Sequence, residues 1–234
     1  GMFCMMFTGC SKQVLPEKMD SIVIDISNLA LPDHVKIVGL GEASHGVSEY
    51  QKMKLDVFKA LVTNHNCDTF LIEGDFGGAL KVEQYIHGGS GTAEEAVSEI
   101  GFAIYRTQEL ADLVDWMRNY NETAPAGEDL HFYGMDMQRY DNNKEYLFTV
   151  LDHGAPDLSE QYKVAFALLT DENRLSLDSA ALKQSESDVL ALLEEMDKQK
   201  EQIVSRVGED AYDFARECAN SIGKCSKLLE SNAN

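Results

Sequence analysis

Two residues suited to acid–base chemistry stand three positions apart in a run of small residues, GLGEASHG, at 39–46. Glu42 supplies a carboxylate and His45 an imidazole. A neutral imidazole held by a carboxylate can take a proton from water near pH 7, because the carboxylate fixes the tautomer and stabilises the imidazolium. The pair is suited to a catalytic edge, although a histidine in a glycine-rich turn is more often a structural group.

Further acidic residues follow two other apolar runs. Glu73 and Asp75 end the run DTFLIEGD, and Asp136 ends LHFYGMD. The carboxyl ends of parallel strands lie at one edge of an open sheet, and such folds bind ligands at that edge. Four carboxylates would then face one crevice with the imidazole. The alternative is that Asp75 and Asp136 are only helix caps or turn residues.

Three short apolar runs, at 35–42, 68–75 and 130–136, are predicted to be the strands that position these residues. They are apolar at nearly every position, as strands buried on both faces of a parallel sheet are. Helical patterns follow each run. We therefore predict an α/β fold with a parallel sheet covered by helices. Three strands make a small sheet, so we expect it to be incomplete.

The chain beyond Asp136 shows helical patterns and no further strand. Its last two helical patterns are separated by Gly208, which predicts an antiparallel helical hairpin. The predicted organisation is a signal-like start at 1–13, an α/β core at 14–153 that carries the active-site edge, and a helical region at 154–234.

Two other segments resemble catalytic motifs but are weak evidence for a catalytic site. Gly-x-Ser-x-Gly requires glycine two positions before the serine, and Glu42 occupies that place before Ser44. The segment HGGS at His87 has the composition of an oxyanion loop, but it follows a helical pattern, where glycines are ordinary C-cap residues.

Composition excludes some partners. Forty acidic residues against twenty basic ones give a formal net charge of −20, which repels nucleic acid and anionic membrane surfaces. Among the five cysteines, Cys218 and Cys225 lie seven positions apart in a helical pattern, which is about 10 Å along the axis and too far for a disulfide. We expect them to be buried thiols.

The amino-terminal stretch MFCMMFTGC is apolar and ends in small residues before Cys10. It resembles the end of a bacterial lipoprotein signal, although a basic region is absent and the apolar run is short. This resemblance implies lipidation at Cys10, attachment to a membrane and a place in the cell envelope. The alternative is an apolar start on a cytoplasmic protein.

Several segments in this order resemble the erythromycin esterase family: GLGEASHG, a helix with a basic residue near its middle, FLIEGD, YRTQELADLVDWMRNYN and HFYGMD. The resemblance covers roughly residues 35 to 140. It implies an α/β core with a helical insertion and hydrolysis of an ester or macrolactone by activated water, with no cofactor, no metal and a small-molecule substrate.

By position, the resemblance makes His45 the general base, with Glu42 and Glu73 as acidic residues of the same site. Lys54 stands where the family commonly has an arginine, which keeps the charge but loses the bidentate fork. Asp75 and Asp136 are expected to support the substrate-binding side of the site. The family continues with further strands and a second active-site histidine, so a chain of this length is expected to be weak or inactive.

Two other functions stay open. A metal-dependent hydrolase could use Glu42, His45, Glu73 and Asp136 as ligands, although zinc-type spacing is absent. A non-catalytic acidic binding protein would keep the crevice without turnover. The sequence names neither the substrate nor the oligomeric state.

Overall fold

The computed structural model describes residues 25–41 and 46–232. Three predicted site residues, Cys10, Glu42 and His45, lie outside these ranges, as do Ser44 and the signal-like stretch. No helix in the described ranges is long and apolar enough to cross a membrane.

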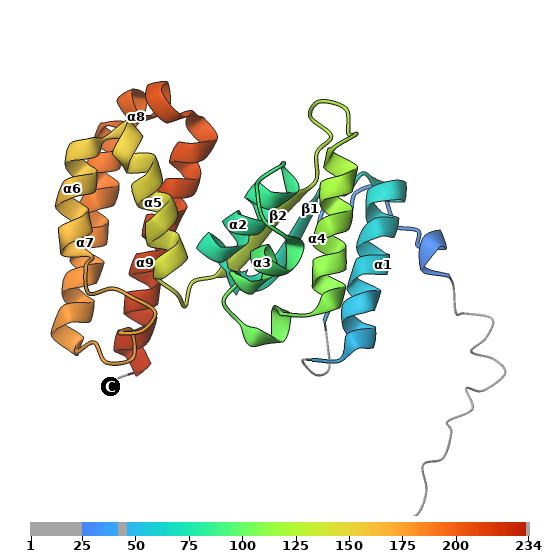
Figure 1. Ribbon diagram of the computed structural model, residues 1–234, viewed down its shortest axis with the longest axis horizontal. Coiled ribbons are helices and arrows are strands. Elements are labelled where there is room, and N and C mark those ends of the chain that lie inside the picture. The colour runs from blue at the N-terminus through green and yellow to red at the C-terminus, as the bar shows by residue number, and fades with distance from the viewer. Residues whose placement is uncertain (1–24, 42–45, 233–234) are drawn as a thin grey trace, which may run out of the picture.

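The described residues form an α/β part and a helical bundle, which lie side by side in Figure 1. The α/β part comprises a 3-10 helix at Ile26–Asn28, α1 (Ser48–His65), β1 (Thr69–Asp75), α2 (Phe76–Ile86), α3 (Ala93–Ser98), a 3-10 helix at Ala103–Tyr105, α4 (Gln108–Asn121) and β2 (His131–Asp136). The bundle comprises α5 (Asp141–Gly154), α6 (Pro156–Ala165), α7 (Ser179–Lys198), α8 (Lys200–Val207) and α9 (Glu209–Asn232).

The sheet consists of β1 and β2, which pair in parallel across the crossover formed by α2 to α4. Alternate residues of these strands, Phe70, Ile72 and Phe132, are buried against α1, α2 and α4. On the opposite face, Leu71 is 54% and Met135 is 64% exposed, whereas Tyr133 packs against Phe214 of α9. The predicted α/β class with a parallel sheet and covering helices is confirmed.

The first predicted strand, 35–42, is wrong in the part that the structure describes. Residues 35–41 have no regular secondary structure and do not pair with β1. Ile37 is 86% exposed, and Val38 and Leu40 are also exposed. An apolar run indicates burial only where a neighbouring strand and helices cover it, and the described residues supply neither here.

Helix α2 connects the sheet edge to the bundle. Asp75 ends β1 and is the N-cap of α2, accepting a 2.6 Å hydrogen bond from the Gly78 N–H. The first turn of α2 is tight, because Gly77 lies against the backbone of Asn143 in α5 and Gly78 lies against the backbone of Glu99. Glycine at these positions lets three backbone segments meet beside Asp75.

Two helix ends in the α/β part are defined by local contacts. A capping box begins α3, with the Thr92 side chain accepting from the Glu95 N–H and the Glu95 side chain accepting from the Thr92 N–H. His87 is the C-cap of α2, and Gly88 follows it at a φ of +93°. The segment HGGS is therefore a helix end.

The bundle buries its own apolar core, which includes Leu147, Leu192, Met196 and Ile222. Helices α7 and α9 pack together as the predicted hairpin arms, but the first arm breaks at Gln199 into α7 and α8. Gly208, at a φ of +91°, separates α8 from α9.

The cysteine prediction is confirmed in the bundle. Cys218 and Cys225 are buried and free. Burial raises the pKa of the Cys218 thiol well above its usual value, so Cys218 stays protonated and unreactive.

Candidate active site at the carboxyl edge of the sheet

Two of the predicted site residues are neighbours at the carboxyl edge of the sheet. Asp75 of β1 pairs in register with Asp136 of β2. The register is irregular between Ile72 and Asp75, the stretch that contains Glu73, and Glu73 is exposed. The edge therefore brings the carboxylate-bearing residues Asp75 and Asp136 together, and Glu73 lies exposed two positions before Asp75.

Asp75 is the least accessible of these acids, at 1% exposed. Its carboxylate accepts hydrogen bonds from the Gly78 N–H at 2.6 Å and from the Asn143 side-chain amide at 2.8 Å. Burial raises the pKa of Asp75 to about 7, and the negative charges of Asp171 and Asp136 add to that rise. Asp75 therefore joins the end of β1 to α2 and α5, and its side chain is not exposed at this edge.

Asp136 lies at the surface end of the same edge. Its carboxylate accepts hydrogen bonds from the Gln138 N–H at 3.0 Å and from the Gln138 side-chain amide at 2.9 Å. These contacts fix the turn that leads from β2 into α5 and leave Asp136 partly exposed.

A cation beside these acids was not singled out from the sequence. Arg139 donates a hydrogen bond to the Gly101 carbonyl at 2.7 Å, and its guanidinium lies 5.6 Å from the centre of the Phe102 ring. Its Nη1 is 4.0 Å from an Asp171 carboxylate oxygen. Arg139 follows Asp136 by three positions, so its place just after a strand end was the available signal.

The predicted base and its partner cannot be placed against this edge. Glu42 and His45 lie outside the described residues. The described residues on either side are Gly41 and Gly46, the latter at a φ of +79°. Lys54 lies half-buried on α1. The assignment of His45, Glu42, Glu73 and Lys54 to one site thus stays a prediction.

Two surface hollows lie away from the edge. One, of about 430 Å³, runs along α5 beside Phe148 and Phe166, and another, of about 580 Å³, lies between α2 and α3 beside Tyr85 and Glu95. Neither is lined by Glu73, Asp75 or Asp136.

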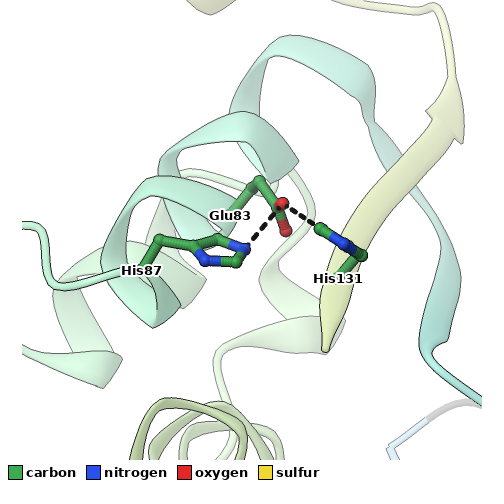
Figure 2. A group of neighbouring side chains, drawn as sticks. All are labelled: Glu83, His87 and His131. Atoms are coloured by element: carbon green, nitrogen blue, oxygen red, sulfur yellow. Dashed lines mark hydrogen bonds and ion pairs between the residues drawn. The ribbon is translucent and has the colours of Figure 1, made fainter. Parts of the chain in front are cut away.

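A second group of ionisable residues lies at the opposite end of β2. Figure 2 shows the Glu83 carboxylate of α2 between the imidazoles of His87 and His131. Among the described residues, this is the group of histidines and acids whose geometry could hold a metal ion. The sequence prediction considered the carboxyl ends of the strands and so missed it.

Comparisons with known proteins agree with the geometry of the fold. A sequence profile described as erythromycin esterase matches residues 62–234. An erythromycin esterase type II of Escherichia coli is 30% identical over 112 residues, which are 48% of this chain and 25% of that enzyme.

Solved structures share the fold at low sequence identity. A Bacillus cereus protein has a TM-score of 0.69 and 22% identity, over 81% of this chain and 47% of its own. A succinoglycan biosynthesis protein has a TM-score of 0.68 and 23% identity, over 82% and 46%. A mutant of the erythromycin esterase EreC in its open conformation has a TM-score of 0.61 and 17% identity, over 93% and 54%. This chain thus spans about half the length of these structures and a quarter of the curated enzyme.

Proposed function

Because this chain belongs to the erythromycin esterase family, we propose that it is a hydrolase that opens an ester or macrolactone with histidine-activated water. The match over residues 62–234 supports the hydrolase class, whereas His45 and Glu42 precede the matched residues and are proposed from the motif at 39–46. Asp75 and Asp136, which end the two paired strands, support it, because that edge is the usual ligand site of such folds.

In the proposed reaction, the neutral His45 imidazole takes a proton from water as the water oxygen attacks the ester carbonyl carbon. The tetrahedral intermediate then collapses, the carbon–oxygen bond to the leaving group breaks, and the imidazolium returns the proton to the leaving alkoxide. Glu42 orients the imidazole, and the exposed Glu73 contributes to the same site. No acyl-enzyme forms.

The buried residues of the edge support the site without contacting substrate. Asp75 fixes the end of β1 to the start of α2 and, through Asn143, to α5. We assign it a positioning role, because a side chain 1% exposed cannot reach a bound ester. Asp136 and Lys54 are proposed to contact the substrate, since both are partly exposed.

The test is hydrolysis of a panel of erythromycin-type macrolides and simple aryl esters, followed by mass spectrometry for the addition of one water. The panel is assayed with this chain and with a longer form of the protein that carries any further strands. His45→Ala is expected to lower the rate about a hundredfold or more. His34→Ala, at an exposed histidine of the described residues, is the matched control.

Three outcomes would contradict the proposal. Turnover that survives His45→Ala would exclude this histidine as the base. Activity lost on chelation and restored by metal would favour a metal-dependent hydrolase. Ligand binding without turnover in both forms of the protein would favour a binding protein.

A further inference from the structure

We propose that Glu83, His87 and His131 form a binding site for a Zn²⁺-type divalent transition-metal ion, separate from the carboxyl edge. Glu83 lies in the last turn of α2, His87 is the C-cap of that helix, and His131 is the first residue of β2. Asp136 ends the same strand five residues later, which places the two sites roughly 16 Å apart along it.

The donor atoms already converge on one point. Glu83 Oε1 lies 3.0 Å from His87 Nε2 and 2.7 Å from His131 Nδ1 (Figure 2). All three potential ligand atoms lie within 4.8 Å of one another. Ligand atoms about 2.1 Å from a tetrahedral zinc ion lie roughly 3.4 Å apart. Side-chain shifts of about 1 Å would therefore open room for the ion.

The donor set suits zinc. Two imidazoles and one carboxylate form a set that zinc sites use, with the fourth position left for water. Both imidazoles now face the same carboxylate oxygen, so each must turn a lone pair toward the ion. A shift of the ring proton to the other nitrogen does this without net proton release.

The surroundings hold the carboxylate in place. Glu83 Oε2 accepts a 2.7 Å hydrogen bond from the Phe132 N–H, which leaves Oε1 directed at the imidazoles. The ring of His131 stacks on Tyr133 with an interplanar angle of 7°. Groups that orient metal ligands in this way raise the affinity of the site for its metal ion.

Exposure permits an ion to enter. The Glu83 side chain is 13% exposed, whereas those of His87 and His131 are 33% and 37% exposed. The Glu83 carboxylate thus lies at the buried end of the site, and the two imidazoles lie nearer to solvent. Without a metal, the same contacts are a shared hydrogen bond that joins α2 to β2, which is the alternative that an experiment must separate.

The experiment is titration of the tag-free chain with Zn²⁺ by calorimetry, together with Co²⁺ followed by visible absorption. We expect one Zn²⁺ per chain and a Co²⁺ spectrum typical of nitrogen and oxygen ligands. His87→Ala and His131→Ala are each expected to raise the Kd about tenfold or more. Glu83→Gln is expected to do the same while keeping an acceptor for the Phe132 N–H.

Controls make the result specific. His153→Ala removes an exposed histidine of α5 that bonds only its own helix backbone at Thr149, and it should leave the Kd unchanged. His87→Ala is the variant least able to disturb folding, because His87 is at the end of α2. The proposal is wrong if the chain binds no Zn²⁺, if His87→Ala and His131→Ala bind it unchanged, or if only His45→Ala abolishes binding.

Discussion

Asp75→Asn is expected to remove a pH dependence of stability that the wild-type chain shows between pH 4 and 8. The pKa of Asp75 is raised from 3.8 in the unfolded chain to about 7 in the folded one. Between these values the folded state holds a proton that the unfolded state has lost. The free energy of unfolding of the wild type therefore falls as the pH rises.

The expected effect is large. A difference between 3.8 and about 7 corresponds to about 4 kcal/mol at about 1.4 kcal/mol per pH unit. This contribution is fully present below pH 3.8 and is lost as the pH passes about 7. Within the window from pH 5 to 8, the wild type should lose between about 2 and 3 kcal/mol relative to Asp75→Asn.

The variant is expected to fold, because asparagine is as good an N-cap as aspartate. Its side-chain oxygen can accept from the Gly78 N–H. Its amide can donate to the Asn143 side-chain oxygen, which has no hydrogen-bond partner among the described residues, once the Asn143 amide turns over and gives up its 3.2 Å bond to the Arg139 carbonyl.

Urea unfolding at pH 5, 6, 7 and 8 checks this, with the wild-type value subtracted from that of the variant at each pH. Asp157→Asn, at an exposed position in the first turn of α6, is the matched control. If the free energies of unfolding of the wild type and Asp75→Asn changed with pH in parallel, Asp75 would have the same pKa in the folded and unfolded states, which contradicts the prediction.

Much of the framework could be predicted from the sequence. The runs at 68–75 and 130–136 contain strands β1 and β2. Short, nearly continuous apolar runs of this length are typical of buried strands and too short for most helices. Gly208 marked the turn before α9. The break at Gln199 was not predictable, because the residues around it, KQKEQ, are good helix formers with no glycine or proline.

The run at 35–41 shows the limit of such patterns. Its apolar residues are as strand-like as those of β1, but the ladder depends on a partner that the pattern does not contain. Because this run has no partner strand among the described residues, Ile37 and Leu40 are exposed.

Each candidate site likewise has features that the sequence could predict and features that it could not. Acids at strand ends could be predicted to share an edge, and Asp75 and Asp136 do pair there. The burial of Asp75 could not, because it depends on Asn143, 68 positions away. His131 likewise joins Glu83 from 48 positions away, although Glu83 and His87 have visible helical spacing.

Gly78→Ala is expected to lower the free energy of unfolding by about 3 kcal/mol or more, although alanine ordinarily stabilises a helix by up to about 1 kcal/mol relative to glycine. A Cβ at this position would lie 1.9 Å from the Glu99 carbonyl oxygen and 2.8 Å from its carbon. These are backbone atoms, so they cannot rotate away. The first turn of α2 would have to move from the segment at 99–101.

That movement would also disturb the carboxyl edge, because the Gly78 N–H is one of the donors that hold Asp75. Denaturant unfolding measures the loss, and Gly39→Ala is the matched control, since a Cβ there meets nothing within 4 Å among the described residues. Gly78→Ala should in addition change the pH dependence described for Asp75, whereas a purely local clash would leave that dependence intact. If Gly78→Ala unfolded at the same denaturant concentration as the wild type, that result would contradict the close approach of α2 to Glu99. It would also contradict the positioning role assigned to Asp75.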